Sequence, residues 1–326
     1  MPTLTPKVKR WLRILAVPVW LSLGGVMLWF ALRQVDHKAL WTSLTGVALT
    51  PLLLGLGVDV LSVFCKATKW HLLLRPVGKV PQFKLQGAIY AGGAVSMVLP
   101  FRLDEAVRAY VAARFSGLPT LAVLGSMALE RLVDVCVLLG FVLALTWLLP
   151  LPPQVSSAVL VASAMAGVLV TVLVMVHLFS SREWLKGVLA RLLDSFAQGS
   201  QALMRPHLVL AAMLFSAGEW LLTGTVAGLV AHAARIELPF GGLILTTTLL
   251  FGSFALPAAP AGIGVFQWAC ALVLPRVYGI NKVQAVTLAL LIHTLLLLPM
   301  ATVGTIVIVA AGVKLSDLKR EDDETP

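Results

Sequence analysis

Six apolar stretches, each long enough to cross a lipid bilayer as a helix, constrain the fold of this chain more than any other feature. A membrane-spanning helix needs about 20 predominantly apolar residues. Only 12% of the residues are charged and 59% are hydrophobic, whereas soluble domains carry about 25% charged residues. We therefore predict an all-α polytopic integral membrane protein. The six predicted spans are 14–32, 48–65, 119–149, 155–179, 207–231 and 284–312.

Two shorter apolar segments, 86–100 and 241–257, each end in Leu-Pro. Each is short for an independent crossing, so we expect both to enter the membrane and turn back. Six full spans plus two re-entrant segments would leave both termini on the same side. The first span, 14–32, is too long for a signal-peptide core and has no small-residue cleavage site, so we expect it to be retained.

The lysines and arginines indicate which side faces the cytoplasm. With cytoplasmic termini, the predicted spans place 19 of the 25 basic residues inside, Lys66 and Lys69 among them, and five outside. This bias is the positive-inside pattern of a membrane protein. Topology and contact with anionic lipid then account for the net charge of +10. We therefore expect no nucleic-acid partner. The predicted location is the cell (inner or plasma) membrane, as a multi-pass protein.

An internal repeat links the two short segments. Ser-x-x-Leu-Pro occurs at 96–100 and 253–257, and a glycine precedes the following long span at Gly117 and Gly279. The two segments would enter from opposite sides, which defines an inverted-topology repeat with halves at about 48–149 and 207–312. Such paired, interrupted segments point to a transport site near the midplane, although ordinary kinked helices remain an alternative. The residues expected to shape the breaks are Pro100, Pro257, Pro260, Gly262 and Gly264.

Charged residues follow the first Leu-Pro. The segment 102–115 forms an amphipathic helix with Asp104, Glu105 and Arg108 on its polar side, either lining a cavity mouth or lying solvated at the interface. The next span carries Glu130, Arg131 and Asp134, which are costly at bilayer depth. Glu130 and Asp134 share a face at i,i+4. We expect an arginine from the preceding helix to pair with them, in a headgroup or ion site or in a purely structural ion-pair lock.

Other polar groups within the spans are candidates for ion coupling. Asp59 and Glu219 are lone acids in the second and sixth helical segments, and His293 lies where the repeat places the counterpart of Arg131. A packing role for His293 is the alternative. We expect no cofactor, metal site or disulfide, because the three cysteines are scattered without metal-ligand spacing. The sequence contains no G-x-x-x-x-G-K-[ST] motif, so we expect no ATP hydrolysis by a P-loop in this chain.

Two motifs in these segments resemble a known family. "LPFRLDEAVRAYVAARFSGLP…ALERLVDV" resembles Pro-x-Arg-x-Gly-Glu-x-x-Arg followed by Glu-Arg-x-x-Asp in the lysylphosphatidylglycerol synthase transmembrane-region (flippase-like domain) family, and "LPAAPAGIGVFQ" resembles its Pro-x-x-Pro-x-Gly-x-Gly-x-x-Glu signature. "KATKWHLLLRPVG" is similar to its basic-aromatic segment. Asp104, Gln267 and His293 depart from the pattern. The matching residues are Arg102, Glu105, Arg108, Glu130, Arg131, Asp134, Pro257, Pro260, Gly262 and Gly264.

The resemblance implies lipid translocation. The family's synthases continue into a soluble aminoacyl-transferase domain, whereas here a single domain, 1–313, is followed by a short charged tail, 314–326, so we expect no lipid aminoacylation and no enzyme activity. We expect a flippase-like transporter for a phospholipid or other lipid with an anionic or phosphate-bearing headgroup. A lipid-modifying enzyme and a scaffold of lipid or polysaccharide biosynthesis are the alternatives, and a homo-oligomer or a biosynthetic partner is left open. The expected substrate-binding residues are Arg102, Glu105, Arg108, Glu130, Arg131 and Asp134.

Overall fold

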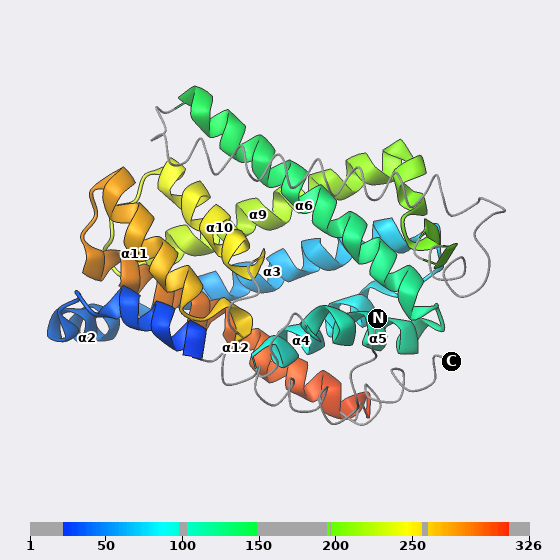
Figure 1. Ribbon diagram of the computed structural model, residues 1–326, viewed down its shortest axis with the longest axis horizontal. Coiled ribbons are helices and arrows are strands. Elements are labelled where there is room, and N and C mark those ends of the chain that lie inside the picture. Colours follow the sequence, from blue (N-terminus) through cyan, green and yellow to red (C-terminus); the bar gives the residue numbers. More distant parts are fainter. Residues whose placement is uncertain (1–21, 98–102, 149–193, 196, 256–259, 313–326) are drawn as a thin grey trace, which may run out of the picture.

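The computed structural model describes residues 22–97, 103–148, 194, 195, 197–255 and 260–312, and this part of the chain is helical without strands (Figure 1). The chain therefore has the all-α fold that its composition predicts. A helix at Ser22–Leu32 comes first. The following helices are α2 His37–Thr45, α3 Leu49–Leu74, α4 Gln82–Ser96, α5 Leu103–Ser116, α6 Thr120–Leu148, η1 Gln201–Met204, α9 Pro206–Ala233, α10 Phe240–Ala255, η2 Pro260–Gly262, α11 Val265–Tyr278 and α12 Lys282–Ala310.

Three of the described helices, α3, α9 and α12, are long and apolar enough to cross a membrane. With 26, 28 and 29 residues, they measure about 39–44 Å at 1.5 Å per residue, more than the roughly 30 Å hydrocarbon core. They match three of the predicted spans and confirm a membrane protein. Of the others, 155–179 lies outside the described residues, and the total of six crossings stays a prediction.

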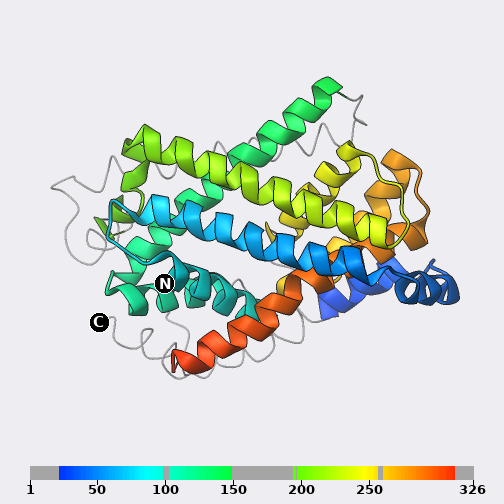
Figure 2. The same ribbon diagram turned by 180° about the vertical axis from the view of Figure 1, so that it is seen from behind.

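Helices α3 and α9 run antiparallel side by side through the middle of the molecule (Figure 2). The backbone N–H of Ala48, just before α3, donates to the carbonyl of Ala233 at the end of α9 (3.0 Å). One apolar core joins α3 to α4, α5 and the start of α6. A second core joins α9 to α10, α11 and α12. Each half of the chain thus builds its own core, and the α3–α9 pair holds the halves together.

Helix α3 is longer than the predicted span 48–65. The predicted span ended at residue 65, and Lys66 and Lys69 were assigned to a cytoplasmic loop. The helix continues to Leu74, and the Lys69 side chain is fully buried. The predicted span ended too early because a hydropathy reading ends a span at its first charges, whereas these two lysines have carboxylate partners inside the bundle. The cytoplasmic side of this segment stays a prediction.

The two halves repeat the same order of helix lengths. Helices α3, α4, α5 and α6 have 26, 15, 14 and 29 residues, and α9, α10, α11 and α12 have 28, 16, 14 and 29. The short helices α4 and α10 measure only about 22–24 Å. Both end just before a Leu-Pro that lies outside the described residues. Re-entry and the inverted orientation of the halves stay predictions, as do the roles of Pro100, Arg102 and Pro257, which the structure does not describe.

Helix α12 reaches across to the first half and crosses α4 at a glycine (Figure 1). A Cβ at Gly304 would clash with the Tyr90 carbonyl oxygen and lie 2.7 Å from the Cβ of Ala94. The two backbones therefore touch at Gly304, and no larger residue fits without separating the helices. By contrast, a Cβ on Gly57 of α3 would meet nothing within 4 Å.

Gly304→Ala and Gly57→Ala form a matched pair that tests this crossing. Alanine is the better helix former by up to about 1 kcal/mol, so Gly57→Ala should leave the free energy of unfolding unchanged or raise it. Gly304→Ala should lower it by about 1–3 kcal/mol because the helices must separate. Equilibrium unfolding in detergent measures both. Equal behaviour of the two variants would contradict the close crossing.

Candidate functional site

A buried lysine ammonium connects three helices at the centre of the molecule. Lys69 Nζ on α3 donates to Asp134 Oδ1 on α6 and to Glu219 Oε2 on α9, the latter at 2.6 Å. Glu130 Oε1, also on α6, lies 3.8 Å from the same Nζ. Lys69, Glu130 and Asp134 are all fully buried, and Glu219 is 5% exposed. Asp134 and Glu219 thus accept hydrogen bonds from the ammonium, whereas Glu130 contributes its charge at a longer distance.

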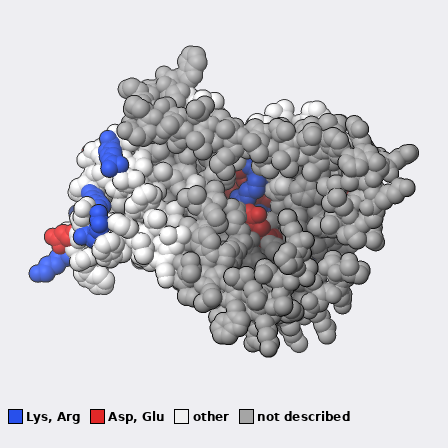
Figure 3. Space-filling view, in the orientation of Figure 1, with Lys and Arg blue, Asp and Glu red and all other residues white. Residues whose placement is uncertain are grey.

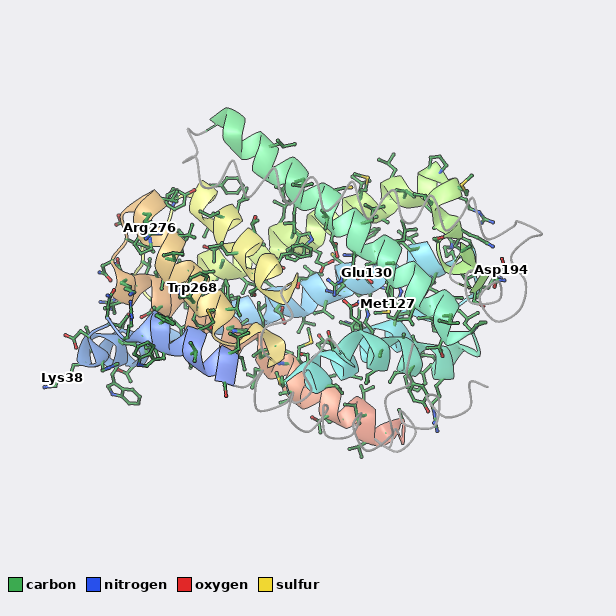
Figure 4. The ribbon with its side chains drawn as sticks, viewed as in Figure 1. Lys38, Met127, Glu130, Asp194, Trp268 and Arg276 are labelled. Carbon is green, nitrogen blue, oxygen red and sulfur yellow. The ribbon has the colours of Figure 1, made fainter. Side chains whose placement is uncertain are left out.

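Two further cations balance the remaining negative charge. Arg108 Nη2 on α5 donates to Glu130 Oε2 at 2.6 Å, and Lys66 Nζ on α3 lies 3.4 Å from Glu219 Oε1. Lys66, Lys69 and Arg108 thus match the three acids one for one, so the cluster is neutral as a whole. This balance is what allows it to be buried, because an unpaired charge in such a place is costly. Figure 4 shows Glu130 in the middle of the bundle.

Uncharged donors complete the cluster. Asp134 Oδ1 also accepts from Ser216 Oγ at 2.7 Å and from Trp220 Nε1 at 3.3 Å, both on α9. The guanidinium of Arg108 stacks over the ring of Trp70, 3.9 Å from its centroid. Trp70 Nε1 in turn donates to Ser126 Oγ on α6 at 3.0 Å. Each charge is therefore held by neighbours from a different helix, and its position depends on the packing of α3, α5, α6 and α9 together.

A second ion pair lies beside the cluster and is more accessible. Arg131 Nη2 on α6 is 3.0 Å from Glu105 Oε1 on α5, and both side chains are 27% exposed. Arg131 follows Glu130 directly, and successive helical residues point about 100° apart, so the two side chains reach different partners. Figure 3 shows charged atoms of both signs near the middle of the face viewed.

Asp59 lies two turns away from the cluster on α3. It is 2% exposed, its Oδ1 lies 3.5 Å from Ser62 Oγ, and its Oδ2 makes no hydrogen bond to any described residue. Asp59, Ser62, Lys66 and Lys69 are spaced i, i+3, i+7 and i+10, which places them on one face of the helix. A polar stripe thus leads along α3 from Asp59 to the buried ammonium.

The second half holds an uncharged counterpart of the Glu105–Arg131 pair. Glu105 and Gln267 are the third residues of α5 and α11, and Arg131 and His293 are the twelfth residues of α6 and α12. Gln267 Nε2 lies 2.9 Å from His293 Nδ1. The two pairs occupy equivalent positions of the repeat, but only the first pair is charged.

His293 holds a tight turn in place. Its Nε2 is 2.9 Å from the carbonyl oxygen of Ala261, which can only accept, so Nε2 carries the proton and Nδ1 accepts from Gln267. Gln267 Oε1 also accepts from the backbone N–H of Gly264 at 2.8 Å. The turn contains positive φ angles at Ala261, Gly262 and Gly264, which favour glycine. This geometry supports the packing role for His293 and accounts for the predicted glycines.

Comparison with known protein families identifies the family of this chain. The model of the family described as "Lysylphosphatidylglycerol synthase TM region" matches residues 11–304. The chain belongs to this family. No curated protein matches it. Membership in this family indicates a membrane protein related to lipid metabolism or transport, and the matched range includes every residue of the charged cluster.

Most of the predicted site residues lie close together in the structure. The expectation that an arginine of the helix after Leu-Pro reaches the α6 acids is confirmed for Arg108 and Glu130. It is wrong for Asp134, whose cation is Lys69. Glu219, expected only as a lone acid, belongs to the cluster. Sequence reasoning missed Lys66, Lys69 and Trp70, although the three leucines at 72–74 indicate a continuing helix.

The cysteines form no disulfide. All three cysteines, Cys65, Cys136 and Cys270, are free. Within the described ranges, no group of three or more His, Cys, Asp or Glu side chains is arranged to hold a metal ion.

Replacing the central lysine tests the cluster. Lys69→Met leaves three carboxylates around an apolar side chain, so the free energy of unfolding should fall by about 3–5 kcal/mol. Lys66→Met removes a cation that is 21% exposed and makes one contact in the cluster, so its effect should be smaller. Denaturation of both variants in detergent provides the comparison. The arrangement is contradicted if Lys66→Met costs as much as Lys69→Met.

Proposed function

We propose that this protein moves a lipid with an anionic or phosphate-bearing headgroup between the leaflets of the cell membrane, without forming or breaking a covalent bond. The observation that carries the proposal is the buried charged cluster beside α3 and α9, two helices long and apolar enough to cross a membrane. Lys69, Glu130 and Asp134 are fully buried there. A single such charge costs about 2.5–3.5 kcal/mol on insertion scales, and charged residues at this depth are typical of substrate and ion pathways.

Stability alone is a weak reason to keep such a cluster. Replacing a buried ion pair by apolar residues of similar volume is often neutral or stabilising. Nevertheless, the cluster and the adjacent pair draw charged side chains from α3, α5, α6 and α9. This concentration of charge supports a role in handling a charged substrate group inside the membrane.

Arg131 and Arg108 are the groups best suited to a phosphate. Arg131 is partly exposed beside Glu105, so a headgroup can reach it from the side. Arg108 Nε is buried and makes no hydrogen bond to a described residue. The guanidinium fork matches phosphate oxygens in geometry and charge. In this proposal the headgroup displaces Glu105 from Arg131, while the chains of the lipid stay in the bilayer.

The topology proposed for this function keeps both termini cytoplasmic, with six full spans and two re-entrant helices. The two halves would then rock against each other around the site, as in transporters with inverted repeats. Asp59 and Glu219 are the proposed proton-carrying groups. Their positions on α3 and α9 support this role, since both are buried and the stripe on α3 connects Asp59 with the lysines that contact Glu219.

Arg131→Gln tests the proposal most sharply. The protein is reconstituted into vesicles with fluorescent phosphatidylglycerol, and dithionite quenching measures how much label reaches the outer leaflet. Losing a charge-assisted hydrogen bond worth about 1.5–3 kcal/mol should slow translocation by about tenfold or more. Arg114→Gln is the matched control, because Arg114 is exposed on α5 and its hydrogen bond is to the Tyr110 hydroxyl.

Quenching that does not depend on the protein for any lipid tested, with the folded state verified by melting, would contradict translocation. Protein-dependent quenching at equal rates for Arg131→Gln, Arg114→Gln and the unmodified protein would contradict the headgroup role of Arg131. Mass spectrometry of the recovered lipids adds a further arm, since a covalently altered lipid would favour the enzyme alternative.

A further inference from the structure

An apolar groove of about 370 Å³ lies between α6, α9 and α10. Its described walls are formed by Leu138 and Phe141 of α6, Leu221 of α9, and Phe240 and Ile244 of α10. Thr247, at its inner side, donates its hydroxyl to the Leu243 carbonyl of its own helix. The hydroxyl is therefore satisfied within α10, and the groove offers hydrocarbon contact.

The floor of the groove is formed by glycines. Gly224 and Gly228 lie one helical turn apart on α9 and both line the groove. A glycine inside a helix costs roughly 0.5–1 kcal/mol relative to alanine. A Cβ at Gly224 would make only an ordinary contact, 3.6 Å from Thr247 Oγ1. Close helix packing therefore does not require a glycine at 224, and the absence of a side chain there leaves the groove open.

The groove opens on the surface of α9 that faces lipid. Leu210, Leu214 and Leu221 are 62%, 68% and 47% exposed on a helix long and apolar enough to cross the membrane. Such a surface at bilayer depth is in contact with hydrocarbon. Leu221 belongs both to this surface and to the wall of the groove, so the groove continues directly from the lipid-facing surface.

The two ends of the groove differ. Phe240, 62% exposed, marks the end next to the turn between α9 and α10, where Arg235 and Glu237 are exposed. Trp220, 8% exposed, marks the other end, and its indole N–H donates to Asp134 of the charged cluster. The groove thus runs from a charged turn at the end of α9 to the wall of the buried site.

We propose that this groove binds one hydrocarbon chain of a membrane lipid from the leaflet that borders the α9–α10 turn. The headgroup of that lipid lies at the turn, and the end of the chain points toward Trp220. The inference rests on the membrane position of α9 and does not require translocation. It adds a lipid-chain site outside the charged cluster, in contact with it through Trp220.

Photo-crosslinking in vesicles tests the site. The full-length protein is reconstituted with phosphatidylcholine that carries a diazirine near the end of one chain, and labelled residues are mapped by mass spectrometry. We expect stronger labelling at Leu221 and Ile244 than on the exposed face of α3 at Leu53 and Leu54. Gly224→Leu should lower labelling at the groove several-fold by filling it.

Gly57→Leu is the matched control, because Gly57 is exposed on α3 and a Cβ added there would meet nothing within 4 Å. It should leave labelling at the groove unchanged. If Gly224→Leu does not fold, Ile244→Phe takes its place in the test. It fills the groove from the opposite wall and should lower the labelling at Leu221 in the same way. Even labelling of all exposed faces would overturn the site, as would cross-links between two copies at α9 with the groove unlabelled. Continued translocation in that case would leave the proposed function intact.

Discussion

The ammonium of Lys69 is the constraint on which the rest of the structure depends. It is fully buried and contacts acids from α6 and α9 that are far from it in the chain. For this arrangement to form, α3 must remain helical to Leu74, α6 must carry Glu130 and Asp134 on one face, and α9 must lie along α3. Lys66 and Arg108 then complete the charge balance. Packing, charge and the candidate site are therefore consequences of one arrangement.

The two halves of the repeat have similar helix lengths but differ in the charge of one equivalent pair of residues. The first half has Glu105 and Arg131 where the second has Gln267 and His293. The charged pair is partly exposed. The uncharged pair is buried and fixes the turn at Ala261 and Gly264. In the proposed function, the first half handles the headgroup and the second half provides a rigid frame against which it moves.

The apolar runs predicted the long helices, and the motifs predicted the family, since both depend on short-range patterns. An arginine of the helix after the first Leu-Pro was expected to reach the acids of α6, because Glu130 and Asp134 form an anionic pair that needs a cation. Lys69 could not be predicted in the same way, since Asp134 and Glu219 are 65 and 150 residues away. Nothing in a single sequence indicates which face of α3 meets α6 and α9. The end of the α3 span was predicted incorrectly for a related reason. Paired charges are tolerated inside a membrane protein, whereas a hydropathy reading ends a span at the first charged residues.

A double-mutant cycle between Lys69 and Asp134 tests the central role of the buried ammonium most directly. Lys69→Met, Asp134→Asn and the double variant are unfolded under identical conditions in detergent, and the coupling free energy is calculated from the three changes. Residues in one ion network show coupling of about 0.5–3 kcal/mol, and the arrangement predicts a value in the upper part of this range, with the double variant more stable than the sum of the single losses implies. Additivity to within about 0.5 kcal/mol would contradict the central role of the Lys69 ammonium.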